Sequence, residues 1–407
     1  MKKIIYTLAF VLIFHCIFNL KNCEGQWIQC NGIPGGFISS LAASGNNMFA
    51  GEQASGVFLS TNNGTNWTQT ALNNQSILSI NISGNNIFAG TFGFGIFRST
   101  NNGSNWTGTA LNDEDANSIV ISGNYIFAGT DDGVFISTNN GSNWTRTLNN
   151  QAVYCLTNSG NNLFAGTAGN GVYLSINNGG TWAQTALNNN NVFSLAASGN
   201  NILAGTSGNG IYLSSNNGSN WNSVNYGLTN QFILSLAFSG ANLIAGTAGG
   251  VFLSTNNGIN WLNKNQGFSV IPEIHSLLVA NNYIFAGTGG NSIWRRSLTD
   301  ILSVINTGSE TPAKYSLSQN YPNPFNPVTK IKFELPTSPH LYKGGQGGVS
   351  LKIFDILGKE IATLVNETLN PGTYEVTFDA SNVSSGIYFY QLRAGEFIST
   401  KKLVLLK

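Results

Sequence analysis

Charged residues are scarce in this chain. Only 9% of its 407 residues are Asp, Glu, Lys or Arg, and the formal net charge is +1. Binding to nucleic acid or to an anionic membrane surface requires clustered Lys and Arg, so the composition argues against both. The charges are also uneven: residues 301–407 hold 10 basic and 8 acidic residues, whereas residues 26–300 hold 5 and 8. This shift predicts a domain boundary near residue 300.

Cysteine and histidine are scarce as well, with four and three residues. Cys16 and Cys23 lie in or beside an N-terminal apolar run, which leaves Cys30 and Cys155. These two fall in different predicted strand types of distant repeats, so the sequence predicts neither a disulfide framework nor a metal site. Both are expected to be small buried hydrophobic residues.

Long apolar runs are absent apart from one at the N-terminus. Met1-Lys2-Lys3, followed by the apolar residues 4–18, has the features of a secretory signal peptide, and small residues favour cleavage after Gly25. We therefore expect residues 1–25 to be a signal peptide. A lipoprotein anchor at Cys23 is the alternative, although the residues before it fit a lipobox poorly. No other run is long enough for a membrane-spanning helix, so no span is expected after signal cleavage.

The chain is instead rich in Asn-Gly turns, and one of them recurs. The pattern S-x-N-N-G-x-x-W begins at residues 60, 99, 137, 175, 214 and 254, a period of 38 to 40 residues. Asn-Asn-Gly between two apolar runs predicts a tight hairpin turn, because Gly and Asn accept positive φ and the Ser hydroxyl can bond the turn. The structural residues of this box are Ser60, Asn62, Gly64, Trp67, Ser99, Asn101, Gly103, Trp106, Ser137, Asn139, Gly141, Trp144, Ser175, Asn177, Gly179, Trp182, Ser214, Asn216, Gly218, Trp221, Ser254, Asn256, Gly258 and Trp261.

Each period contains four short predicted strands, which favours a β-propeller over a sandwich. An Ala-Gly pair in the second strand occurs seven times, so the predicted fold is all-β, with a seven-bladed β-propeller over residues 26–298. The box is missing after Trp294, but Trp27 precedes the first repeat as Trp67 precedes the second. We therefore expect the N-terminal strand to complete the seventh blade. The alternative is that residues 298–305 supply that strand.

The box resembles the Asp-box (BNR) repeat of sialidase-like β-propellers, whose pattern is S-x-D-x-G-x-x-W. It departs from that pattern at the third position, where Asn replaces Asp in all six copies. In that family the box lies on an outer turn away from the ligand face, so the resemblance implies a fold and no chemistry. Sialidases use an arginine triad, and Arg98, Arg146, Arg295 and Arg296 of this chain are not placed to converge. No catalytic residue is predicted.

The C-terminal part is predicted to be a linker, residues 299–314, and a small Ig-like β-sandwich, residues 315–407, with strands near 329–335, 349–355, 373–379, 386–393 and 397–405. Residues 320–327, 354–358, 371–374, 385–388 and 401–402 resemble the type A C-terminal sorting domain of the type IX secretion system. The resemblance implies that the type IX machinery moves the chain across the outer membrane, for release or surface attachment, and that the sorting domain is then removed. An adhesive Ig-like module that stays attached is the alternative.

Acidic residues form one candidate site. In a propeller, the loops that join the outer strand of one blade to the inner strand of the next share a face with the turns between second and third strands. Five acidic residues fall on this face near the third blade: Asp113, Glu114, Asp115, Asp131 and Asp132. Their oxygens could bind calcium, and paired carboxylates could hydrolyse a glycan. Solvated loop charge is the plainer interpretation, and no cofactor other than calcium is considered.

Aromatic residues form the better candidate site on the same face. Phe92 and Phe94 occupy a turn where other repeats have small residues, Tyr226 and Phe232 flank another loop, and Glu52 replaces the usual Thr at the inner rim. Aromatic rings on a rigid rim can stack on sugars or grip a protein loop, and packing across the channel mouth is the alternative.

We therefore expect a secreted or cell-surface, monomeric, non-enzymatic propeller that binds a polysaccharide or a protein. One competing hypothesis is a secreted glycan-active hydrolase that uses the loop carboxylates of blades two and three. Another is a propeller that resembles the protein-assembly factors of this superfamily and binds partner proteins.

Overall fold

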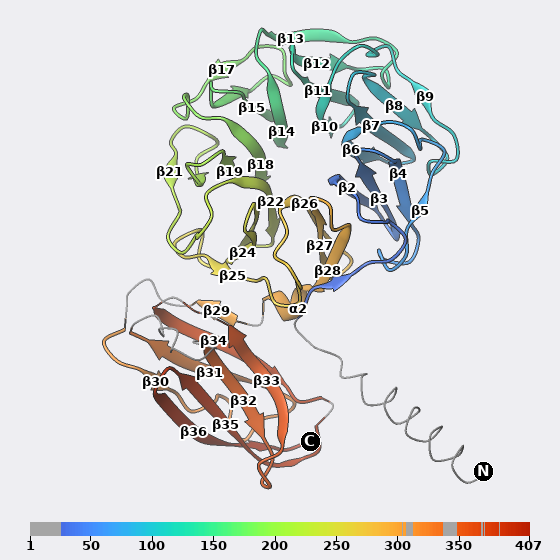
Figure 1. Ribbon diagram of the computed structural model, residues 1–407. Helices are drawn as coiled ribbons and strands as arrows, with labels where there is room; N and C mark the ends of the chain where they lie inside the picture. The colour runs from blue at the N-terminus through green and yellow to red at the C-terminus, as the bar shows by residue number, and fades with distance from the viewer. Residues whose placement is uncertain are drawn as a thin grey trace, which may run out of the picture.

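The computed structural model of the chain describes residues 26–302, 304–306, 312–336, 348–367, 369, 371–381 and 383–407. The fold is all-β, as the sequence predicts: a ring of four-stranded sheets is followed by a smaller β-domain (Figure 1). The predicted signal peptide, residues 1–25, lies outside the described residues.

Seven four-stranded antiparallel sheets form the ring within the described residues, and we name their strands A to D from the centre outward (Figure 1). The A strands are β2 (Ile38–Ser44), β6 (Ile77–Ser83), β10 (Ala116–Ser122), β14 (Val153–Ser159), β18 (Val192–Ser198), β22 (Ile233–Ser239) and β26 (Ile274–Ala280). The B strands are β3 (Asn47–Glu52), β7 (Asn86–Thr91), β11 (Tyr125–Thr130), β15 (Asn162–Thr167), β19 (Asn201–Thr206), β23 (Asn242–Thr247) and β27 (Tyr283–Thr288). The C strands are β4 (Gly56–Ser60), β8 (Ile96–Ser99), β12 (Gly133–Ser137), β16 (Val172–Ser175), β20 (Ile211–Ser214), β24 (Gly250–Ser254) and β28 (Ile293–Ser297). The D strands are β5 (Thr68–Gln69), β9 (Thr107–Gly108), β13 (Thr145–Asn149), β17 (Ala183–Gln184), β21 (Asn222–Ser223), β25 (Leu262–Asn263) and β1 (Ile28–Gln29).

The last sheet joins the two ends of the propeller. Its D strand is β1, which pairs with β28 through Ile28 opposite Arg295, and residues 298–305 do not supply that strand. Trp27 is 2% exposed, stacks on Phe268 and donates its indole N–H to the carbonyl of Lys264 at 2.6 Å. The first described residues are therefore part of the ring.

Neighbouring blades pack through the buried side chains of strand B. Phe88 of β7 shares an apolar cluster with Ala116 and Ile119 of β10 and with Ile126 of β11, so a side chain of one blade fills the space against the next. The two blades approach each other closely at Gly90, where an added Cβ atom would lie 2.4 Å from the Ala116 carbonyl oxygen. Interlocking at this density makes each blade depend on its neighbours.

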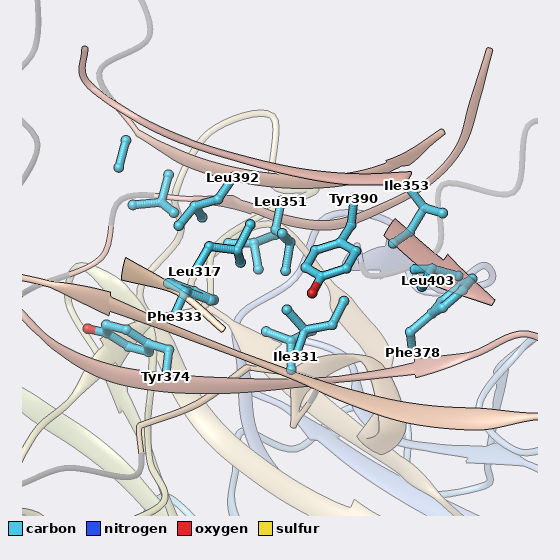
Figure 2. Packing of buried hydrophobic residues seen from close by; sticks show 14 of the residues in the cluster. Leu317, Ile331, Phe333, Leu351, Ile353, Tyr374, Phe378, Tyr390, Leu392 and Leu403 are labelled. Carbon is cyan, nitrogen blue, oxygen red and sulfur yellow. The ribbon is translucent and has the colours of Figure 1, made fainter. Parts of the chain in front are cut away.

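The C-terminal domain is a sandwich of two four-stranded sheets, in the orders β29-β34-β31-β30 and β33-β32-β35-β36. Its strands are β29 (Val304–Asn306), β30 (Ser316–Leu317), β31 (Val328–Leu335), β32 (Val349–Phe354), β33 (Glu360–Glu367), β34 (Gly372–Asp379), β35 (Gly386–Ala394) and β36 (Phe397–Leu405). Figure 2 shows Ile331 and Phe333 of one sheet facing Leu351 and Leu392 of the other. Strands β29, β30 and β33 are not among the strands predicted from the sequence, and the pairing of β33 with β32 contains two register shifts that interrupt its alternation.

Part of the segment predicted as a linker, residues 299–314, has regular structure. The short helix α2 spans Leu298–Ile301, and Ile301 is fully buried against the propeller. Strand β29 then pairs with β34 of the sandwich. The sequence of this segment is polar overall and predicts no regular structure. The burial of Ile301 depends on the propeller, and the pairing of β29 depends on the sandwich.

Candidate functional site

The candidate site is the face of the propeller that carries the D–A loops and the B–C turns, which we call the D–A/B–C face. Phe92 and Phe94 lie on it, with 59% and 60% of their surfaces exposed. They occupy the turn between β7 and β8 and are separated by Gly93, which has φ +75°. Two exposed aromatic side chains on one turn form a small apolar patch, the kind of surface feature at which binding sites are found.

Backbone hydrogen bonds hold this turn in place. The Phe92 amide donates to the Ser76 carbonyl at 2.9 Å, and the Gly93 amide donates to the Asp115 carboxylate at 2.6 Å. Thr91 closes the base of the turn, because its hydroxyl donates to the Gly95 carbonyl at 2.8 Å. The backbone that carries the two phenyl rings is therefore held in one conformation by these hydrogen bonds.

The five acidic residues lie near this turn, but each described interaction points to a structural partner. Asp115 binds the Gly93 amide, Asp131 accepts from Asn117 at 2.9 Å, and Asp132 pairs with Arg146 at 2.6 Å. Burial raises the pKa of Glu114, although a hydrogen bond with Thr130 opposes the rise. Asp113 is exposed.

No group of three or more His, Cys, Asp or Glu among the described residues could hold a metal ion. The calcium site considered from the sequence gains no support from these side chains and stays a prediction.

Glu52 is buried at the end of β3, where the other B strands end in Thr. Its carboxylate accepts from the backbone amides of Ala54 at 2.8 Å and Phe37 at 3.2 Å. In other blades the Thr hydroxyl donates to a carbonyl of the turn, as Thr91 does to Gly95, whereas the Glu52 carboxylate accepts from two backbone amides. This geometry gives Glu52 a structural role and removes it from the ligand-facing surface.

Tyr226 and Phe232, predicted to flank one loop, lie at its two ends. Phe232 is 51% exposed just before β22, and its backbone is held by the Asn230 side chain and by the Ala248 amide. Tyr226 is 59% exposed, but its carbonyl accepts from the Trp261 amide beside the outer strand of the next blade. Phe232 therefore belongs with the inner rim, and Tyr226 belongs with the perimeter.

Two apolar residues on the D–A/B–C face were missed by the sequence analysis. Val270 and Ile271 are 72% and 52% exposed in the D–A loop before β26. A signal was present: this loop is long, since Ile274 follows Trp261 by 13 positions whereas Ala116 follows Trp106 by 10.

At the channel mouth, Tyr154 packs on Phe193 and Phe37 packs on His275. Burial lowers the pKa of His275 despite its hydrogen bond with Glu273.

The repeated box lies on the turn between strands C and D and is structural. In the second blade, the Ser99 hydroxyl accepts from the Gly103 amide at 2.9 Å and donates to the Asn101 side chain at 3.0 Å. Asn102 has φ +54°, as the turn chemistry predicts, and its counterparts in the other copies have φ between +52° and +56°. The Asn oxygen performs the bonding role without a charge.

The four arginines of the propeller have separate partners. Arg98 binds Asn86, Arg146 pairs with Asp132, Arg295 binds Asn63 and Thr65, and Arg296 binds Gln266 and the Lys264 carbonyl. They form no cluster on the D–A/B–C face.

Both cysteines among the described residues are free and buried. Burial raises the pKa of the Cys30 thiol to about 11, against opposing effects of Arg295 and Trp67, and it also raises the pKa of Cys155. Both cysteines are core residues, as the sequence predicts.

Comparisons with known proteins agree with this architecture. Residues 319–406 match the family described as secretion system C-terminal sorting domain, and residues 95–190 match the DUF6242 beta propeller domain. No curated protein sequence matches the chain.

Similar solved structures include YCF48 bound to D1 peptide, with 15% identity, a TM-score of 0.55, and coverage of 68% of this chain and 98% of that one. PorZ of the type-IX secretion system of Porphyromonas gingivalis has 16% identity and a TM-score of 0.52, with 92% and 60% covered. The GH74 xyloglucanase from Xanthomonas campestris has 12% identity and a TM-score of 0.55, with 76% and 59% covered. At these identities the likeness concerns the fold alone.

The sorting domain indicates export to the cell surface or the extracellular space. Among the described residues, no helix is long and apolar enough to cross a membrane. The chain is thus a secreted β-propeller protein with a type IX secretion sorting domain at residues 319–406.

Proposed function

We propose that the D–A/B–C face of the propeller binds an uncharged polysaccharide outside the cell, without hydrolysing it. The observation that supports this most directly is the fixed turn that exposes Phe92 and Phe94. Flat apolar rings held by a rigid backbone can cover the apolar face of a sugar ring at little entropic cost.

The surroundings of the two rings favour a neutral ligand. The D–A loops expose side-chain amides, which both donate and accept hydrogen bonds as sugar hydroxyls require. The exposed asparagines in these loops, or at the end of the preceding strand in the case of Asn149, are Asn73, Asn74, Asn112, Asn149, Asn150, Asn188, Asn189 and Asn191. Asp132 is paired with Arg146, whereas Asp115 and Asp131 accept hydrogen bonds from neutral donors and keep their negative charge, which disfavours an anionic polysaccharide on this face.

A glycan array and affinity electrophoresis with neutral polysaccharides would test this proposal. We expect the double variant Phe92→Ala, Phe94→Ala to lose binding. The matched control is Ile176→Ala, because Ile176 is 72% exposed but lies in a C–D box turn. Unchanged binding in the double variant, or equal loss in the control, would contradict the proposal.

The hydrolase hypothesis makes a different prediction in the same experiment. If the polysaccharide is cleaved, and if Asp115→Ala or Asp131→Ala abolishes that cleavage, then the face is a catalytic site. The structure offers it less support, since both carboxylates are engaged by neighbouring groups.

Protein binding is the second candidate, because a similar propeller has been solved as YCF48 bound to D1 peptide. The apolar residues Phe232, Val270 and Ile271 on the same face would suit a peptide. Binding of unglycosylated peptides that is lost with Phe232→Ala, and no binding of glycans, would favour this candidate.

A further inference from the structure

The outer strand of the sixth blade is covered, unlike its counterparts. Leu262 of β25 is 2% exposed. The residues in the same position of the other D strands are exposed: Thr68, Thr107, Thr145, Ala183, Asn222 and Ile28. Trp261 and Lys264, on either side of β25, are also almost fully buried. A leucine buried on the perimeter of a ring must be covered by a group outside the ring.

The covering group is the sorting domain. Leu262 is a member of the apolar cluster that forms the core of the sandwich and contains Leu317, Val365 and Leu369. Figure 1 shows β25 at the edge of the propeller that is nearest to β29 and β34. One propeller side chain thus completes the apolar packing of the second domain.

The connection between the domains is short on both sides. Ile301 is fully buried in a propeller cluster with Trp27, Val251 and Ile284. Val304 already pairs with Val376 of β34. Only residues 302 and 303 separate a residue packed on the propeller from a strand of the sandwich, so the domains have little freedom to separate.

We propose that the outer edge of blade six is a docking surface for the chain's own sorting domain, so that the two domains behave as one rigid body. Relative motion is the usual behaviour of linked domains unless an apolar interface restrains it. Because β25 lies on the perimeter, docking leaves the D–A/B–C face open while the sorting domain is attached. Removal of the sorting domain would expose Leu262 beside a free strand edge, a surface that promotes association.

Distance measurements between spin labels would test the docking. Labels at Thr107→Cys and Ile398→Cys, both at exposed positions, report on the propeller and the sandwich in the chain from residue 26 to 407. The native thiols Cys30 and Cys155 are buried and stay unlabelled. We expect a single narrow distance distribution, which Leu262→Asp broadens.

The matched control is Thr68→Asp, which places the same charge at the equivalent position of blade one and should leave the distribution narrow. If Leu262→Asp does not fold, Leu262→Thr introduces the residue found in the first three blades and should also broaden the distribution. A broad distribution in the parent chain, or a narrow one in a folded Leu262 variant, would overturn the docking proposal. Glycan binding plays no part in this measurement, so its outcome is independent of the proposed function.

Discussion

The carboxylate of Asp115 accepts a hydrogen bond from the backbone amide of Gly93 at 2.6 Å. This bond ties a D–A loop to the B–C turn that carries Phe92 and Phe94. The acidic loop can therefore position the aromatic turn, a role not predicted from the sequence, for which solvated loop charge was the plainest interpretation and calcium binding and catalysis were the alternatives.

We expect Asp115→Ala to loosen the turn and to weaken glycan binding. A hydrogen bond to a charged group contributes about 1.5–3 kcal/mol, so we expect an affinity loss of about tenfold or more. Hydrogen exchange at the Gly93 amide should become faster. Asp115→Asn keeps an oxygen acceptor, so its exchange rate at Gly93 should lie between those of the parent protein and Asp115→Ala. Identical exchange rates in all three proteins would contradict the positioning role of Asp115.

The box serine should contribute to stability in each of the six blades that carry the box. In Ser99→Ala the Gly103 amide loses the hydroxyl that accepts its hydrogen bond, and Asn101 loses a donor. An unsatisfied buried amide costs about 1–3 kcal/mol. Urea unfolding should show this decrease, whereas Thr100→Ala, at the exposed second position of the same box, should change little. Equal effects of the two changes would argue against the hydrogen-bonded box.

Ring closure should depend on Trp27. Its side chain is 2% exposed and its indole donates to the Lys264 carbonyl, so Trp27→Ala leaves a large cavity between the ends of the propeller. Truncating a buried aromatic residue costs about 3–5 kcal/mol. Ile28→Ala, at the next residue and the first of β1, removes a side chain that is 59% exposed and provides the control. A Trp27→Ala protein as stable as the control would mean that β1 does not lock the ring.

The sorting domain should lose stability in acid through Glu375. Burial alone would raise the pKa of this carboxyl, but Lys330 at 2.8 Å and Lys332 at 3.4 Å lower it overall. A carboxyl with a lower pKa in the folded state stabilises the fold above its unfolded pKa of about 4.3 and loses that contribution as the pH falls further.

Hydrogen exchange in β31 and β34, corrected for the intrinsic effect of pH, measures this loss. We expect protection in the parent chain to fall below about pH 4. In Glu375→Gln the protection at neutral pH should already be lower and should change less with pH. Parallel pH profiles for the two proteins would show that the pair does not contribute.

Turn chemistry was readable from the sequence because it is local. Asn-Gly pairs occupy positive φ at the box turns, and the Trp and Ser residues that repeat with them mark strand ends. The loop residues were harder to place. Tyr226 and Phe232 are six positions apart in the loop between β21 and β22. The fold nevertheless places Tyr226 at the perimeter and Phe232 at the inner rim.

Periodicity and turn chemistry act within a few residues, so the sequence by itself determined the all-β repeat, the turns and the sorting domain. Tertiary structure alone decided which surfaces meet. Leu262 occupies the same strand position as exposed threonines of other blades. It is buried because it packs in the apolar core of the sorting domain. Glu52 likewise looks like a free acid until the fold brings the amides of Phe37 and Ala54 to it. Such burial depends on segments far apart in the chain, and no local pattern encodes it.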